Sequence, residues 1–532
     1  MPKTLQFLPA GSNRFLIDLD DLDTTIQLFD ALSSSPIPGI VEIVPGARTL
    51  SVTYDPLVVL PRDLYEAISA VTPNALTECV GALVEIPVRY DGEDLSFVAE
   101  YLGWTVEKLI QRHAEATFTV AFTGFAPGFA YMTCDDPAFE LPRRDSPRTR
   151  IPAGSVALAG QFCGIYPSDT PGGWQLLGTT TVPMWDLNRE KAALLSPGDR
   201  VKFKAITEAE FAPVFSYKKS DVIQGSDGKG LRILATDRPA LFQDIGRPGN
   251  AHQGVSQSGA ADQEALRNAN GLVGNPPATA AIEVTYGGFS LRTDMPETLA
   301  VAGAPTPITI LTVDGRSVSI SSEMPFALDA GETLKLGAPS TGVRTYLALR
   351  GGYDVPEILG SSSTDTLAKI GPAAIKAGDL IVPAHGPSSA VSAHPLAVAS
   401  LPKGSDTVVL DVIMGPRTDW FTPEAIRTFV EQPWTVTPES SRVGVRLYGL
   451  TALERDNVEE LPSEGTSVGS IQVPRNGQPV LFLADHPITG GYPVIAVVAN
   501  HHLSLAAQLP IGVRVRFNVI ANFDPQVKEF DR

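Results

Sequence analysis

The prediction of the fold rests on residues Pro152 to Trp174, PAGSVALAGQFCGIYPSDTPGGW. It contains short apolar runs separated by glycine and ends in a turn of proline and glycine before an aromatic residue. Such runs are typical of the strands of an antiparallel barrel or sandwich. A similar pattern returns between Pro462 and Pro493, as PSEGTSVGSIQVP and then ITGGYP, at different intervals. The echo predicts two copies of one barrel type.

The sequence outside these two stretches divides the chain into regions. Residues 1–82 alternate short strands with helices, one of which Asp23 would cap, and this pattern predicts a small α+β sandwich. Residues 83–216 begin with two helices, 95–102 and 106–116, and continue as short strands. The polar stretch 217–230 is interpreted as a linker. Residues 231–532 are again mainly strands, and the Pro/Ser/Ala-rich stretch 384–406 would divide them into two lobes.

Composition limits the class of function. The chain has 532 residues, of which 43% are hydrophobic, and a formal net charge of −18, so it can bury several cores. Its negative charge argues against nucleic acid or an anionic membrane as a partner. Three cysteines without a CxxC pair predict no disulfide framework and favour a reducing cytoplasm. We expect no secretory signal and no membrane span, since polar residues interrupt the apolar stretch 494–513.

The motif TGFAPGFAYM, residues 123–132, is the first candidate for binding. Pro127 stiffens a turn, and Gly128 and its neighbours let backbone N–H groups approach a ligand closely, with Phe129 beside them. The alternative is a barrel corner packed with aromatic side chains.

The motif PRRDSPRTR, residues 142–150, concentrates positive charge in an acidic protein. Arg143, Arg144 and Arg148 would bind an anionic substrate or the phosphates of a nucleotide, because guanidinium groups pair with both. The alternative is a solvated loop or a contact between protein chains.

The loops that follow offer hydrogen-bonding groups for a small polar ligand. The candidate residues are Ser155, Gln161, Tyr166, Asp169, Thr170, Gly172 and Gly173. Each alone could equally be a turn residue with its own local partners.

A polar, glycine-rich loop opens the second half, within residues 242–275. Asp244, Arg247 and Ser258 lie in or after this loop, ahead of a helix predicted to begin near Ser258 and to end at Gly274. The N-terminus of a helix presents free N–H donors to an anion. The alternative is ordinary capping of the helix by Ser258.

The last candidate group lies between Ser463 and Pro493. Asp485 and His486 could transfer protons. Glu464 and Gln472 would line the same end of the barrel, and Gly490, Gly491 and Tyr492 would form a tight turn beside it. Neighbours on a strand face opposite sides, so Asp485 and His486 would act together only if the turn has already begun there. The alternative is a structural histidine.

Several motifs are absent from the sequence. GSDGKG, residues 225–230, lacks the spacing of a phosphate-binding Walker loop. There is no HExxH sequence and no carrier lysine of the Met-Lys-Met type, so we expect no metal motif and no biotin attached to this chain.

Taken together, these motifs resemble two known families. FTGFAPGFAYM, SPRTRIPAGSVALAG and GIYPSDTPGGW resemble the allophanate hydrolase subunit 1 family, which includes KipI and the B subunit of 5-oxoprolinase. FQDIGRPG, SGAADQEALRNANGLVGN and SEGTSVGSIQVP resemble the subunit 2 family, which includes KipA and the C subunit of 5-oxoprolinase. The order of the motifs resembles a fusion of B and C, and also the carboxyltransferase region of urea carboxylase. Ser256 and the run His486-Pro487-Ile488 depart from the usual pattern.

The resemblance implies a fold and an activity. It implies a ferredoxin-like domain followed by cyclophilin-like β-barrels, and ATP-dependent opening of 5-oxo-L-proline to glutamate with a separate A subunit of the LamB/YcsF type. ATP and Mg²⁺ would be co-substrate and cofactor, and phosphorylation of the lactam carbonyl would supply the leaving group. Two alternatives stay open: a biotin-dependent carboxyltransferase acting on urea or a related amide, and a regulator that inhibits a histidine kinase. Assembly into a homo-oligomer also stays open.

Overall fold

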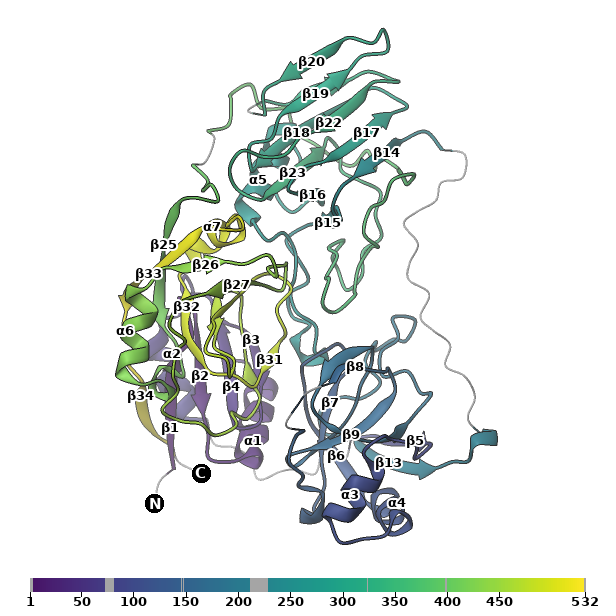
Figure 1. Ribbon diagram of the computed structural model, residues 1–532, viewed down its shortest axis with the longest axis vertical. Helices are drawn as coiled ribbons and strands as arrows, with labels where there is room; N and C mark the ends of the chain where they lie inside the picture. The colour runs from purple at the N-terminus through teal and green to yellow at the C-terminus, as the bar shows by residue number, and fades with distance from the viewer. Residues whose placement is uncertain are drawn as a thin grey trace.

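The computed structural model describes residues 3–71, 81–144, 146, 148–210, 228–322, 324–397 and 400–530. Strands predominate and form barrel-like sheets, which confirms the predicted mainly β fold with an α+β N-terminal domain (Figure 1). Within these ranges no helix is both long enough and apolar enough to cross a bilayer. Cys79 and most of the predicted linker, residues 217–227, lie outside them. We call residues 3–210 the first half and residues 228–530 the second half.

The N-terminal domain is a five-stranded sheet covered by two helices. The strands occur in the order β3-β4-β2-β1-β34, with the bounds β1 (Lys3–Pro9), β2 (Arg14–Asp18), β3 (Ile40–Pro45), β4 (Thr49–Tyr54) and β34 (Gln526–Phe530). The helices are α1 (Leu22–Ser34) and α2 (Pro61–Ser69). Asp21, and not Asp23, caps α1, because its side chain accepts the N–H of Thr24. Strand β34 pairs with β1, so the end of the chain completes the sheet that its beginning starts.

The first barrel is a seven-stranded sheet in the order β12-β9-β10-β7-β6-β13-β5. Its strands are β5 (Leu83–Val88), β6 (Thr117–Thr123), β7 (Ala130–Thr133), β9 (Ser155–Ala159), β10 (Phe162–Ile165), β12 (Gln175–Thr179) and β13 (Arg200–Ala205). Helices α3 (Leu95–Tyr101) and α4 (Val106–Glu115) lie between β5 and β6, as predicted to within one residue. An isolated bridge between Arg89 and Thr179 connects the two ends of the sheet.

The second barrel is closed and repeats this strand order. Its strands are β25 (Thr407–Met414), β26 (Trp434–Val436), β27 (Gly444–Tyr448), β29 (Ser470–Gln472), β30 (Val480–Phe482), β32 (Val494–Val498) and β33 (Arg514–Ala521). Its circular order β32-β29-β30-β27-β26-β33-β25 matches the first barrel strand by strand. In each barrel the first strand pairs in parallel with the last. The sequence echo therefore corresponds to two copies of one barrel.

Each barrel also carries a two-stranded ribbon at the place of the echo. In the first barrel β8 (Arg148–Ile151) pairs with β11 (Thr170–Gly172), and in the second β28 (Glu464–Gly465) pairs with β31 (Thr489–Gly490). The glycine pairs of the sequence, 172–173 and 490–491, thus lie at equivalent positions of the two barrels.

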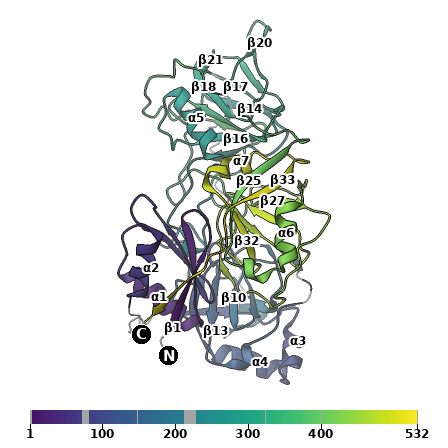
Figure 2. The ribbon, with the colours of Figure 1, turned by 90° about the vertical axis from the view of Figure 1, so that its left-hand side faces the viewer.

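A third β-rich unit precedes the second barrel and is built from two packed sheets. The six-stranded sheet has the order β20-β19-β22-β17-β14-β24, and the five-stranded sheet has the order β15-β16-β23-β18-β21 (Figure 2). Their strands include β14 (Leu231–Thr236), β15 (Leu241–Gln243), β16 (Ala281–Thr285), β17 (Phe289–Thr293), β19 (Ile308–Leu311), β20 (Ser317–Ile320), β21 (Phe326–Leu328), β22 (Thr333–Leu336) and β24 (Leu380–Ile381). We call this unit the sandwich. Helix α5 (Gln263–Val273) packs on its β18 (Glu297–Gly303) and β23 (Arg344–Leu349). The predicted start of α5 near Ser258 is wrong: Asp262 caps it by accepting the N–H of Ala265, whereas Ser258 has φ +53°.

The N-terminal domain contacts both barrels: α1 lies against β6 of the first, and β4 lies against β28 of the second. In Figure 1 it overlaps the second barrel. Leu22 and Ile26 of α1 pack against the aromatic cluster of the first barrel. On the other side Arg417 of the second barrel pairs with Asp18 at 3.1 Å and with Glu464 at 2.8 Å. Because Arg417 is buried, these ion pairs are shielded from water and tie the beginning of the chain to its last barrel.

Candidate functional site

Loops from both halves meet at one place, which we call the junction and define as residues 123–130, 251–258 and 485–491. The N–H of Phe125 donates to Thr489 Oγ1 at 3.0 Å, and the N–H of Gly128 donates to the carbonyl of Gln253 at 3.0 Å. The hydroxyl of Thr123 donates to the carbonyl of His252 at 2.6 Å. The junction therefore exists only when both halves are present.

The two halves approach so closely at the junction that one position has no room for a side chain. Gly254 has φ +76°, and a Cβ atom there would lie 2.5 Å from the carbonyl oxygen of Ala126 in the other half. Glycine is required here both by the backbone conformation and by this contact.

Two of the six described non-glycine residues with positive φ lie in the junction. Phe125 and Ser258 have φ of +62° and +53°, and Lys369, whose charge acts on Asp169 of the first barrel, has φ +58°. Left-handed conformations of residues other than glycine cost about 1–3 kcal/mol each and are concentrated at functional sites. Their position supports the junction as the functional site.

A buried ionic network connects the junction to the sandwich. Asp485 receives two hydrogen bonds from Arg442, at 2.9 and 3.0 Å, and one from the hydroxyl of Ser258 at 2.7 Å. Arg442 also pairs with Glu283 of the sandwich at 2.6 Å. Burial alone would raise the pKa of Asp485, but the charge and hydrogen bonds of Arg442 lower it. Asp485 is therefore held ionised.

Models of known protein families match both halves of the chain. The carboxyltransferase domain, subdomains C and D, matches residues 5–195, and the carboxyltransferase domain, subdomains A and B, matches residues 253–519. The chain belongs to the carboxyltransferase domain family.

Relatives named as single subunits each match part of the chain. The chain is 35% identical to the 5-oxoprolinase C subunit of Escherichia coli over 290 residues, which cover 54% of this chain and 90% of that protein. It is 36% identical to the 5-oxoprolinase B subunit of Bacillus subtilis over 197 residues, which cover 34% of this chain and 81% of that protein. These matches agree with a fused B and C arrangement.

The chain is also similar to a solved structure and to a urea-processing enzyme. The crystal structure of TTHA0988 covers 95% of this chain and 99% of its own, with 33% identity and a TM-score of 0.81. Urea amidolyase of Saccharomyces cerevisiae is 34% identical over 290 residues, which cover 51% of this chain and 16% of that enzyme. The relatives named as enzymes or their subunits therefore place the chain in an enzyme complex.

Asp365 carries a second carboxyl group close to Asp485, and sequence reasoning missed it. It is buried, and its Oδ2 accepts the hydroxyl of Ser256 at 2.8 Å. Burial and the charge of Asp485 raise the pKa of Asp365 to about 6. Ser256, one of the two departures from the family pattern, thus supplies a hydrogen bond that proline could not.

Replacing Asp365 with asparagine is expected to stabilise the chain at pH 8, by up to about 2 kcal/mol, and to change little at pH 4. A carboxyl group whose pKa is raised on folding stabilises the folded state when it is protonated. This contribution to stability is lost as pH rises from about 4 to about 6. Unfolding midpoints of Asp365→Asn and the parent chain at the two pH values measure the effect. Equal shifts at both values would contradict it.

His486 and Asp485 follow the end of β30, so the turn has already begun at both residues, the condition that sequence reasoning set for joint action. They nevertheless face different partners. His486 Nδ1 lies 2.8 Å from the carbonyl of Pro487, so Nδ1 carries the proton and Nε2 keeps its lone pair. Burial lowers the pKa of His486 to about 4, so the ring is neutral at pH 7.

The predicted arginine cluster separates into two groups. Arg143 crosses to the second half, where its Nε lies 2.8 Å from Glu460 and its side chain is 37% exposed. Arg144 and Arg148 instead pair with Asp94 of their own barrel, at 2.6 and 2.9 Å. The Asp94 carboxylate thus occupies the place that the sequence analysis assigned to an external anion.

The aromatic residues of the first motif pack together below the junction. The rings of Phe129 and Tyr166 lie 5.4 Å apart, and Pro127 is buried beside them. A Cβ atom on Gly172 would lie 2.4 Å from the Tyr166 hydroxyl, so this glycine lets the ribbon cross the ring. These residues form the wall of the first barrel that faces the second half.

The other loop candidates of the first barrel have local partners or lie outside the junction. Ser155 donates its hydroxyl to the carbonyl of Pro152, and the carbonyl of Gly173 accepts the N–H of Arg144. Asp169 pairs with the exposed Arg150 at 2.7 Å, and Gln161 lies on an exposed turn between β9 and β10. Thr170 opens β11, where it pairs with Ile151.

The candidates around the second ribbon hold its turn in place. Gln472 donates to the carbonyl of Tyr492 at 2.9 Å, and a Cβ atom on Gly490 would meet the same amide. Gly491 lies beside the guanidinium of Arg143. The ring of Tyr492 is 38% exposed and lies under Arg455.

Glu464 stands at the other end of this ribbon. One carboxylate oxygen pairs with Arg417, and the other, Oε1, is buried without a hydrogen-bond partner among the described residues. Burial raises its pKa.

Asp244 and Arg247 act within the second half. Asp244 is buried and accepts the Ser361 hydroxyl and the N–H of Ser362, both at 2.7 Å. Arg247 is also buried and donates to the carbonyl of Ser363. Ser258, predicted with them, contacts Asp485 instead. The pair therefore braces the loop that carries Asp365.

Sequence reasoning also assigned no role to Arg442, Thr489 or Thr366. The N–H and the hydroxyl of Thr366 both donate to Asp485. Thr489 belongs to a motif that could have indicated it, since it precedes the glycine pair. No motif surrounds Arg442 or Thr366.

Two cavities lie apart from the junction. One of about 290 Å³ borders α5 and His501, and one of about 240 Å³ lies where residues 339–342 meet residues 402–404. Neither is lined by residues 123–130 or 485–491. We place the site at the junction because both halves, the strained residues and the buried network converge there.

Proposed function

We propose that this chain is the fused B–C component of an ATP-dependent 5-oxoprolinase, which opens the lactam of 5-oxo-L-proline to glutamate together with a separate A subunit. One observation carries the proposal. Relatives named as C and B subunits match 54% and 34% of this chain, and loops of its two halves are hydrogen-bonded to each other at the junction. A site shared by the two halves gives a physical reason for joining them in one chain.

The chemistry requires an activated amide. Phosphorylation of the lactam carbonyl oxygen would give a good leaving group, and the step needs cations at the phosphates and donors at the developing oxyanion. Arg143 supplies a partly exposed cation at the junction. The hydroxyl groups of Thr489 and Ser258 lie on the loops that would hold the substrate.

Proton transfer falls to His486 in this proposal. Its neutral Nε2 has a free lone pair, whereas Arg442 keeps Asp485 ionised and occupied. Asp485 would position Ser258 by accepting its hydroxyl. The charges of Asp485 and Glu464 are already paired with arginines, so neither is a ready ligand for Mg²⁺, which would arrive on the phosphates of ATP.

The second candidate function is a biotin-dependent carboxyltransferase acting on urea or a related amide. The likeness to urea amidolyase favours it. It would need a biotinylated partner protein.

ATP hydrolysis distinguishes the two functions. The full chain would be assayed with the A subunit and with 5-oxoproline, urea or buffer, and separately with a biotinylated carrier and urea. We expect hydrolysis that depends on both 5-oxoproline and the A subunit. Carboxyl transfer to urea without stimulation by 5-oxoproline would contradict the proposal.

Replacing Arg143 with alanine is expected to lower 5-oxoproline-dependent turnover at least about tenfold, because a charge-assisted contact to an anion is lost. Its partner gives a matched control: Glu460→Ala removes the same exposed ion pair, which is worth about 0–1 kcal/mol, and should leave turnover nearly unchanged. If both variants lost activity equally, Arg143 would act only by joining the halves.

A further inference from the structure

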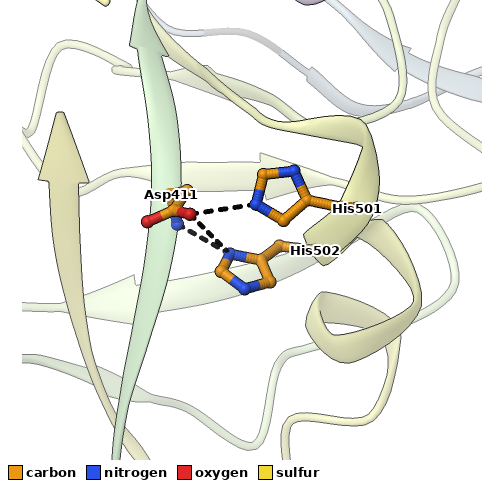
Figure 3. A group of neighbouring side chains, drawn as sticks. All are labelled: Asp411, His501 and His502. Atoms are coloured by element: carbon orange, nitrogen blue, oxygen red, sulfur yellow. Dashed lines mark hydrogen bonds and ion pairs between the residues drawn. The ribbon is translucent and has the colours of Figure 1, made fainter. Parts of the chain in front are cut away.

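Three metal-binding side chains gather at one end of the second barrel, on segments far apart in the sequence (Figure 3). Asp411 lies on β25, and His501 and His502 lie on the 3-10 helix η5 (Asn500–His502). His501 Nε2 is 2.9 Å from Asp411 Oδ2, and His502 Nδ1 is 3.9 Å from the same oxygen. One donor atom of each residue therefore lies within 4.8 Å of the others.

The surroundings fix two of these donors. Asn518 donates to Asp411 Oδ1 at 2.7 Å, which leaves Oδ2 directed at His501. Ligands held by a hydrogen bond of this kind are typical of metal centres. His502 Nδ1 accepts the backbone N–H of Asp411 at 2.8 Å, so His502 is the tautomer that carries its proton on Nε2.

We propose that Asp411 and His501 bind a divalent transition-metal ion such as Zn²⁺, Ni²⁺ or Co²⁺. Asp411 Oδ2 and His501 Nε2 are the two preset ligands. His502 joins through Nδ1 once its ring turns away from the N–H of Asp411. One carboxylate and two imidazoles favour these ions over Mg²⁺ and Ca²⁺, which prefer oxygen ligands.

The site opens onto space for further ligands. His501 and His502 line the cavity of about 290 Å³, together with the polar side chains of Asp262, Glu264, Asn268 and Ser504. The His501 side chain is 58% exposed, so the ion can enter from solution. Water or a small ligand in this cavity would complete the coordination of the ion.

Titration of the full chain, without a histidine tag, with Zn²⁺, Ni²⁺ and Mg²⁺ tests the proposal. We expect one Zn²⁺ or Ni²⁺ per chain and no Mg²⁺. Asp411→Asn and His501→Ala should each weaken binding at least about tenfold. His394→Ala, which removes another exposed histidine, should leave it unchanged.

A second readout does not depend on calorimetry. Bound Co²⁺ should give a visible absorption spectrum, and saturating Ni²⁺ should raise the unfolding midpoint of the parent chain and not that of His501→Ala. Absence of stoichiometric binding, or equal binding by His501→Ala and the parent chain, would overturn the proposal.

Discussion

Replacing Arg442 with methionine is expected to destabilise the chain by about 3–5 kcal/mol. Arg442 is buried and neutralises Asp485 and Glu283, which are buried as well. Methionine fills much of the same volume but leaves two carboxylates without this partner, and an uncompensated buried charge is far more costly than the loss of an exposed pair. Urea denaturation, followed by a signal from the second half, measures the change.

Arg446 provides the control for this variant. It lies in the same barrel, on β27, with an exposed side chain. Arg446→Met is expected to change stability by no more than about 0.5 kcal/mol. Equal effects of the two substitutions would show that the network around Arg442 does not hold the second barrel to the sandwich.

Replacing Gly254 with alanine is expected to lower 5-oxoproline-dependent turnover about a hundredfold, because displacement of a site by about 1 Å has effects of this size. The added methyl group would lie 2.5 Å from the carbonyl oxygen of Ala126 and would force the two halves apart at the junction. Steady-state ATP hydrolysis in the presence of the A subunit measures the loss.

Gly249→Ala is the control that separates the effect of this contact from the effect of backbone strain. It has φ +81°, close to the φ +76° of Gly254, but a Cβ atom there would meet nothing within 4 Å. Gly249→Ala should therefore carry the same conformational cost, about 1 kcal/mol, and keep most of the activity. If both alanine variants lost turnover equally, strain and not the approach of the halves would explain the effect.

The barrels could be predicted from sequence because their signals are local. Glycine or proline directly precedes several of the short strands, such as Gly154 before β9 and Pro493 before β32, and the ribbons repeat at 148–172 and 464–490, so the duplication is visible in the residues themselves. The turn has begun at Asp485 and His486, because strand β30 ends at Phe482, but this local signal did not indicate that the two side chains face different partners.

Contacts between distant segments could not be predicted in this way. Strand β34 resembles any exposed strand, and only its pairing with β1 shows that it belongs to the first domain. The arginine cluster indicated a binding site for an anion, but Asp94, 50 and 54 residues away in sequence, already pairs with Arg144 and Arg148. The cap of α5 was misplaced because Ser258 and Asp262 are both good capping residues, and the hydroxyl of Ser258 donates to Asp485 instead.

The most direct test of the account is a crystal structure of the chain with the A subunit, 5-oxoproline and a non-hydrolysable ATP analogue. We predict that 5-oxoproline binds at the junction, within hydrogen-bonding distance of Thr489 or Ser258, and that Arg143 contacts the phosphates. Substrate bound in the cavity beside His501, or elsewhere with the junction closed, would contradict the claim that the two halves build the active site together.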